Sequence, residues 1–126
     1  MKLYRVILPV NDIEKAQGFY SNIFEKEGLR VSPGRHYFNL SGIILACYDP
    51  VAEGDDTGEG WKFHPNQYIY IAVDNLTQIY ERIKLSGAKE VETIEEMPWG
   101  EKLFYAKDPF GNPICFVDDK TIFTGK

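Results

Sequence analysis

Only two thiols in this sequence could act as nucleophiles or as soft metal ligands. Cys47 and Cys115 form no CxxC pair, and each lies within an apolar stretch. This pattern predicts reduced, buried thiols, as expected for a protein of the cytoplasm. Nucleophilic catalysis needs a base beside the thiol, and no histidine stands near Cys115 in the sequence. A packed structural thiol is the preferred interpretation of Cys115, and a nucleophile is the alternative.

Two histidines are the only imidazoles that could serve as bases or metal ligands. His36 precedes a predicted strand, and His64 lies beside Pro65 in a long polar loop. Both could join Glu53 or Glu59 in a metal site, but a fixed ligand set needs a rigid scaffold. We therefore expect two solvated or hydrogen-bonding histidines.

Aromatic side chains are more plentiful, at 14% of the residues. Their simplest role is core packing, but aromatic rings also line sites that bind flat organic molecules. Trp99 lies between Pro98 and Gly100, which favours a loop at the rim of a pocket over regular burial. The aromatic residues predicted at a pocket or its rim are Tyr37, Trp61, Phe63, Tyr70, Trp99 and Tyr105.

Net charge and hydropathy exclude two kinds of partner. The formal charge is −5 and no basic run occurs, which argues against nucleic acid, because phosphate contacts need clustered Lys and Arg. No stretch approaches the roughly 20 apolar residues that span a bilayer, so we expect no membrane association. The start of the chain has no signal-peptide pattern, which also favours the cytoplasm.

The elements that must position these residues occur in two similar sets. Alternating and β-branched patterns predict strands over residues 3–10, 29–32, 37–40 and 43–48 in the first half, and over 67–73, 89–96, 101–107 and 113–118 in the second. A helical spacing of apolar residues follows the first strand of each half. Asn11 and Asp12 are both candidates for the cap of the first helix, and Asp74 caps the second helix at a corner equivalent to that of Asp12. Asp108 opens a tight turn before the last strand.

This repeat predicts an α+β fold of two βαβββ modules that form a curved, half-barrel mixed sheet around a cavity. We expect one domain over residues 1–126, with module one at 1–48, a linker loop at 49–66, module two at 67–118 and a tail at 119–126. The concave face of the sheet is the natural place for a ligand.

Five motifs resemble those of the vicinal oxygen chelate superfamily, which includes glyoxalase I, extradiol dioxygenases and bleomycin resistance proteins. They are Pro9-Val10-Asn11-Asp12, Ile71-Ala72-Val73-Asp74, Gly87-Ala88, Pro98-Trp99-Gly100 and Asp108-Pro109-Phe110-Gly111-Asn112. The similarity covers residues 3–118, and the Pro98 motif looks most like the bleomycin-resistance branch. The resemblance implies the two-module fold and a homodimer.

The resemblance also implies where a metal would be held. Metalloenzymes of this superfamily bind a divalent ion through inward-facing His and Glu on the first and last strands of the modules. The matching positions here are Arg5, Leu45, Tyr68 and Cys115. A guanidinium repels a cation and leucine has no donor atom, so we expect no metal and no other cofactor.

Three of these positions become candidates for ligand binding. Arg5 could grip an anionic group if it points into the cavity, or it is a surface charge if the strand phase is shifted by one residue. Tyr68 and Cys115 would face the same cavity as Arg5.

The preferred hypothesis is a metal-free protein that binds a small aromatic or antibiotic-like compound. One alternative is an enzyme, either a metal-dependent lyase, isomerase or dioxygenase with relocated ligands, or a metal-free enzyme that uses Cys115, Tyr68 or Arg5. Another alternative is an accessory module with a vestigial cavity.

Overall fold

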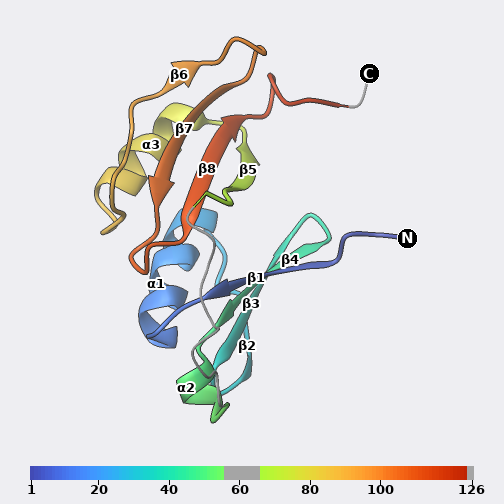
Figure 1. The fold of residues 1–126 in the computed structure, drawn as a ribbon, viewed down its shortest axis with the longest axis vertical. Helices are drawn as coiled ribbons and strands as arrows, with labels where there is room; N and C mark the ends of the chain where they lie inside the picture. The colour runs from blue at the N-terminus through green and yellow to red at the C-terminus, as the bar shows by residue number, and fades with distance from the viewer. Residues whose placement is uncertain (56–65, 125–126) are drawn as a thin grey trace. The chain divides into compact units, whose positions relative to one another are not determined.

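The computed structural model describes residues 1–55 and 66–124 of the protein. The chain divides into two compact units, Met1–Phe63 and His64–Lys126, which correspond to the two predicted modules. Each unit contains a four-stranded sheet of mixed direction and a helix that packs on it (Figure 1). The predicted α+β fold of two βαβββ modules is therefore confirmed. That the two sheets enclose one cavity stays a prediction.

The first module has the strand order β1-β4-β3-β2. Strand β1 is parallel to β4, and the other neighbours are antiparallel. Its elements are β1 (Arg5–Pro9), α1 (Ile13–Phe24), β2 (Leu29–Ser32), β3 (Arg35–Leu40) and β4 (Ile43–Tyr48). The prediction placed these elements correctly, with differences of up to two residues at some strand ends.

Helix α1 begins after Asp12, one of the two predicted cap residues. The Asp12 side chain accepts a hydrogen bond from the backbone N–H of Lys15 (3.1 Å), which satisfies a donor that the first turn leaves open. The apolar face of the helix is buried, and Tyr20 and Phe24 pack on Phe38 of β3, with ring centroids 6.3 and 5.5 Å away. This contact joins α1 to the sheet.

Gly28 lies three residues beyond the helix cap Glu25, directly before β2, and allows the chain to pass close to β3. Its φ of +68° is left-handed, and a Cβ there would stand 2.7 Å from the Tyr37 carbonyl oxygen. Glycine is needed here because β3 passes so close.

The predicted linker contains a short helix, α2 (Pro50–Glu53). The Asp49 side chain caps it through the N–H of Ala52 (3.2 Å). Glu53 accepts a hydrogen bond from the N–H of Gly34 and forms an ion pair with Arg35, so α2 is tied to the start of β3.

The second module has the strand order β5-β8-β7-β6, again with one parallel pair, β5 and β8. Its elements are β5 (Ile69–Val73), α3 (Leu76–Lys84), β6 (Glu95–Glu96), β7 (Lys102–Lys107) and β8 (Pro113–Asp118). Tyr80 of α3 meets Phe104 of β7 edge to face, and Phe104 stacks on Phe116 of β8.

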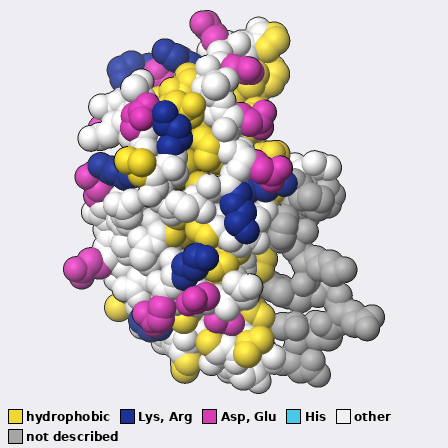
Figure 2. All heavy atoms as spheres, turned by 90° about the vertical axis from the view of Figure 1, so that its left-hand side faces the viewer, with side chains coloured by type: hydrophobic (Ala, Val, Ile, Leu, Met, Phe, Trp, Pro, Cys, Tyr) yellow, Lys and Arg dark blue, Asp and Glu magenta, His cyan; other side chains and the backbone are white. Residues whose placement is uncertain are grey.

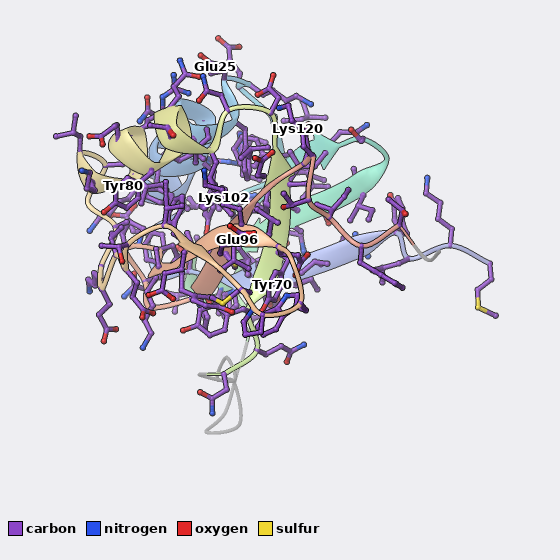
Figure 3. All side chains as sticks on the ribbon, turned by 90° about the horizontal axis from the view of Figure 1, so that it is seen from above. Glu25, Tyr70, Tyr80, Glu96, Lys102 and Lys120 are labelled. Carbon is purple, nitrogen blue, oxygen red and sulfur yellow. The ribbon has the colours of Figure 1, made fainter. Side chains whose placement is uncertain are left out.

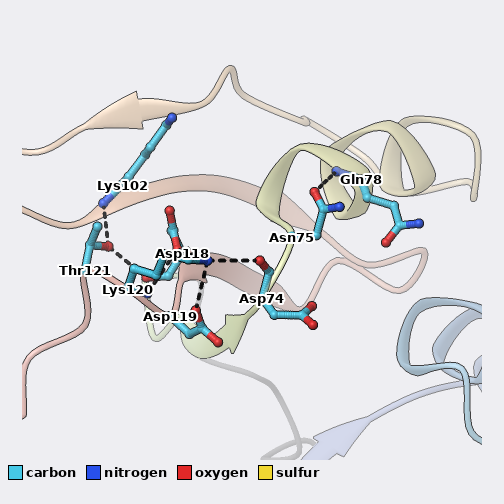
Figure 4. A network of polar contacts seen from close by, with 8 residues as sticks. All are labelled: Asp74, Asn75, Gln78, Lys102, Asp118, Asp119, Lys120 and Thr121. Carbon is cyan, nitrogen blue, oxygen red and sulfur yellow. Dashed lines mark hydrogen bonds and ion pairs between the residues drawn. The ribbon is translucent and has the colours of Figure 1, made fainter.

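The cap of α3 corrects one prediction. Asn75, and not Asp74, accepts the hydrogen bond from the N–H of Gln78 (3.1 Å) (Figure 4). The Asp74 carbonyl oxygen accepts a hydrogen bond from the Lys120 ammonium (3.4 Å), which also lies near Asp119. The helix starts one residue later than the Asp74 pattern predicted.

The strand predicted over residues 89–96 is mostly absent. Only Glu95–Glu96 forms β6, while Lys89 makes an isolated antiparallel bridge with Lys107. Glu90 has a left-handed φ of 49°, which breaks the extended backbone between these two pairings. The segment still runs beside β7, because the N–H of Glu92 donates to the Tyr105 carbonyl (2.9 Å).

The turn between β7 and β8 is present as predicted, and a buried carboxylate organises it. Asp108 accepts hydrogen bonds from the backbone N–H groups of Phe110 and Asn112 and from the Asn112 side chain, at 2.8–2.9 Å. Asp108 and Asn112 are both fully buried.

Among the described residues, no helix is long and apolar enough to cross a membrane.

Candidate functional site

Each sheet has one face covered by its helix and a second face, here called the open face. In the first module, Phe38 packs on α1, and its cross-strand partner Leu45 shares that side. Because side chains alternate along a strand, Ala46 and its partner Tyr37 lie on the open face. Leu45 was expected to face inward with Arg5, and the register shows that it faces the helix.

Arg5 lies on the open face of the first sheet beside Tyr37. Its guanidinium donates a hydrogen bond to the Tyr37 hydroxyl (2.7 Å), and its central carbon lies 5.5 Å from the Tyr37 ring centroid and 5.7 Å from that of Tyr4. Arg5 is exposed, so the Tyr37 ring supports the cation without desolvating it fully. The remaining donors of the guanidinium fork suit a planar anionic group.

Three tyrosines meet on the open face of the second sheet. The ring of Tyr105 lies 4.9 Å from that of Tyr68 and 6.4 Å from that of Tyr70, both edge to face. Tyr70 is 52% exposed, whereas Tyr68 and Tyr105 are partly buried against Leu103 and Cys115. We call Tyr68, Tyr70 and Tyr105 the tyrosine cluster. The hydrogen bond with Tyr70 and partial burial raise the pKa of Tyr105, which keeps its hydroxyl protonated.

Figure 3 locates the exposed member of this cluster. Tyr70 lies on β5, and Tyr80 lies well apart from it on α3. Tyr80 packs on Phe104 from the helix, so the two tyrosines lie on opposite sides of one sheet.

Cys115 lies beneath the tyrosine cluster and is fully buried. Burial, together with the Glu101 carboxylate, raises its pKa to about 12. At neutral pH the sulfur therefore stays a thiol, which is a poor nucleophile and a poor metal ligand. The packing role predicted for Cys115 agrees with this environment.

Trp99 lies in the loop between β6 and β7, where 62% of its side chain is exposed. Its indole N–H donates to the Glu101 carboxylate (2.7 Å), and the N–H of Gly100 closes a turn with the Met97 carbonyl. Trp99 lies in a loop as predicted, and its place at the rim of a pocket stays a prediction. Trp61 and Phe63, predicted beside it at a pocket rim, lie outside the described residues, as do Glu59 and His64.

The residues at the metal positions do not fit a divalent ion. Arg5 and Tyr68 each stand seven residues before their helix caps, so they occupy matching positions in the two modules. Ala46 pairs with Ile7 as Cys115 pairs with Tyr70, which makes Ala46 the matching residue of β4. An arginine, a tyrosine, an alanine and a buried thiol with a raised pKa do not form a ligand set for such an ion.

His36 does not supply a replacement ligand. It is buried between α1 and the first sheet, where its Nδ1 accepts from Arg30 (3.3 Å) and its Nε2 therefore donates to the Glu27 carbonyl (2.7 Å). Both ring nitrogens are used in the fold. Within residues 1–55 and 66–124, no three His, Cys, Asp or Glu side chains gather closely enough to hold a metal.

A groove of about 300 Å³ lies at the edge of the open face of the second sheet. We call it the Tyr68 groove, and its lining residues are Tyr68, Glu90, Val91, Glu92 and Lys107. Sequence reasoning found Tyr68 and missed Glu90, Val91 and Glu92, because residues 89–96 read as a regular strand; it also missed Lys107. The face shown in Figure 2 carries charged side chains of both signs with hydrophobic side chains between them, so no large patch of one sign gathers there.

Residues 2–116 match the family model described as the Glyoxalase/Bleomycin resistance protein/Dioxygenase superfamily. The lactoylglutathione lyases of Salmonella typhimurium and Salmonella typhi are each 24% identical to this chain over 132 residues, which cover 95% of this chain and 94% of each relative.

Solved structures have the same fold at lower identity. A lactoylglutathione lyase from Agrobacterium tumefaciens is similar with a TM-score of 0.71 and 19% identity, over 94% of both chains. A glyoxalase/bleomycin resistance protein from Albidiferax ferrireducens T118 gives a TM-score of 0.74 at 19% identity, over 91% of this chain and 97% of that one.

Proposed function

This chain belongs to the glyoxalase/bleomycin resistance protein/dioxygenase superfamily, and we propose that it binds a small aromatic compound without using a metal ion. The observation that carries the proposal is the tyrosine cluster on the open face of the second sheet. Tyrosine rings offer a flat apolar surface with a hydroxyl for orientation, which suits an aromatic ligand.

We propose as ligand-binding residues those that the sequence analysis selected and whose side chains lie on the open face of their own sheet. Tyr68, Tyr70 and Tyr105 supply rings in the second module, and Arg5 with Tyr37 supplies donors in the first. Cys115 supports the cluster from below as a protonated thiol.

The proposal is tested by a thermal-shift screen of aromatic compounds, followed by isothermal titration calorimetry of the compounds that stabilise the protein. Tyr70→Ala should weaken binding about tenfold, because a ring contact contributes about 0.5–1.5 kcal/mol beyond its buried area. Tyr80→Ala is the matched control, since it removes a tyrosine of α3 that packs on the opposite side of the same sheet. Both variants are first checked for a cooperative unfolding transition.

Two results would contradict the proposal. One is a screen in which no compound stabilises the wild-type protein. The other is a compound whose affinity falls with Tyr80→Ala and is unchanged by Tyr70→Ala.

A second candidate function is a lyase activity like that of the Salmonella relatives, favoured by their 24% identity over nearly the whole chain. A metal-dependent lyase activity is disfavoured, because the four metal positions offer no ready ligand set. The residues at these positions are Arg5, Ala46, Tyr68 and Cys115. Lactoylglutathione lyase activity should therefore be absent after incubation with Ni²⁺, Zn²⁺ or Mn²⁺. A stoichiometric metal in protein purified without chelators, together with turnover, would establish the lyase instead.

We also propose a homodimer. Light scattering gives the mass directly, and a monomer at all concentrations would rule the dimer out.

A further inference from the structure

The Tyr68 groove is formed by an interruption in the sheet. Lys89 and Lys107 exchange two backbone hydrogen bonds of 2.8 Å, and Glu92 pairs again with Tyr105. Between these pairings Glu90 turns into a left-handed conformation, which separates residues 90–92 from a regular ladder and leaves the groove. At about 300 Å³ it lies at the lower end of the range for small-molecule sites.

The groove carries more negative than positive charge. The Lys107 ammonium forms an ion pair with Glu90 (2.9 Å), so these two charges offset each other. Glu92 is exposed, and within the described parts of the chain its carboxylate has no ion-pair partner. The carboxylate of Glu92 is therefore the charge available to a ligand.

One wall of the groove is aromatic. Tyr68 lines it, and the ring of Tyr105 supports Tyr68 from 4.9 Å at 61°. The face of an aromatic ring carries negative electrostatic potential and attracts cations. An aromatic wall and an unpaired carboxylate therefore favour the same kind of ligand group.

We propose that the Tyr68 groove binds the cationic end of a protonated or quaternary amine, whose aromatic part rests on the tyrosine cluster. This inference rests on the proposed function, because Tyr68 belongs to both the groove and the cluster. In this proposal Glu92 is the counter-ion, Tyr68 is the aromatic contact, and Lys107 neutralises Glu90 within the groove. The net charge of −5 adds a long-range attraction for a cation.

Three probes of nearly the same shape test the charge preference: benzyltrimethylammonium, the neutral neopentylbenzene and the anionic phenylmethanesulfonate. Each is titrated into ¹⁵N-labelled protein, and amide shift changes give both the affinity and the place of binding. The cation should bind at least about fivefold more tightly than the neutral probe, as one exposed charge contact is worth about that factor. Its largest shifts should fall at Tyr68, residues 89–92 and Lys107.

Two substitutions should move the affinity for the cation in opposite directions. Glu92→Gln removes the unpaired carboxylate and should lower the affinity for the cationic probe about fivefold. The affinity for the neutral probe should not change. Lys107→Gln removes the ion-pair partner of Glu90 and should strengthen binding of the cationic probe. Glu96→Gln is the matched control, because it removes an exposed acid of β6 outside the groove and should change neither probe.

The possible failures are distinguishable. Equal affinity for the three probes, a preference for the anion, or no response to Glu92→Gln overturns the amine inference. If compounds from the aromatic screen still bind through Tyr70, the proposed function stands. A protein that binds none of the probes and no screened compound refutes both.

Discussion

The reactivity of Cys115 is the sharpest test of the site's chemistry. Both thiols are fully buried, so the Cys47→Ala variant is used to leave Cys115 as the single cysteine. Alkylation by iodoacetamide at pH 7.5 is followed by intact mass spectrometry, in the native protein and in urea.

The expected rate follows from the ionisation of the sulfur. The pKa of Cys115 rises from 9.0 to about 12, mainly because burial disfavours the thiolate and secondarily because Glu101 lies near. Each pH unit changes the thiolate population tenfold, so the native thiolate fraction is about a thousandfold below that of an ordinary cysteine. A thiolate of higher pKa is also the stronger nucleophile, which offsets part of this loss, so native alkylation should be at least about thirtyfold slower than alkylation in urea.

A native rate within tenfold of the rate in urea would refute this reasoning and restore Cys115 as a candidate nucleophile or ligand. Glu101→Gln separates the two causes. Since burial is the larger cause, this variant should raise the native rate by less than the full difference. The Cys47→Ala/Cys115→Ala double variant shows the background of the assay.

Three further predictions concern stability. The pKa values of Cys115 and Tyr105 are raised above their unfolded values, so their contribution to stability is fully present below pH 9 and is lost as the pH rises toward 12. Urea midpoints at pH 8 and pH 11 should show this loss of stability. The loss should be smaller in the Cys115→Ala variant. An identical loss in that variant would contradict the role of Cys115. Phe116→Ala should lower the free energy of unfolding in urea by about 3–5 kcal/mol, because its fully buried ring stacks on Phe104. A loss below 1 kcal/mol would contradict this prediction and show that neighbouring side chains fill the cavity. Asp108→Ala should cost about 3 kcal/mol, because it leaves buried donors of Asn112 without an acceptor, and an unchanged melting temperature would disprove that role.

Local sequence patterns predicted helix starts and turns well where the type of one or two residues determines them. The first helix cap was narrowed to Asn11 or Asp12, because both offer a side-chain acceptor at the start of an apolar period, and the structure selects Asp12. The Asp108 turn was identified because Pro and Gly stand at their preferred positions. The assignment of the second cap failed because Asp74 and Asn75 are both good caps, and only the backbone path selects between them.

The faces of the strands were harder to predict, since a shift of one residue turns every side chain to the other side. Cys115 was correctly grouped with Tyr68, whereas Leu45 was placed one residue out of phase. The pairing of Leu45 with Phe38 decides this, and that contact joins residues of two strands that local periodicity treats separately.

The sequence by itself determined the two-module fold, the shortage of metal-ligating residues and the abundance of aromatic rings, because repeats and residue types are visible without coordinates. Only the tertiary structure decided that three tyrosines meet on one face, that Cys115 is held as a thiol beneath them, and that Glu90 opens a groove beside Tyr68. These properties depend on register, burial and one left-handed residue. All three arise from contacts between segments far apart in the chain, which residue type and spacing do not determine.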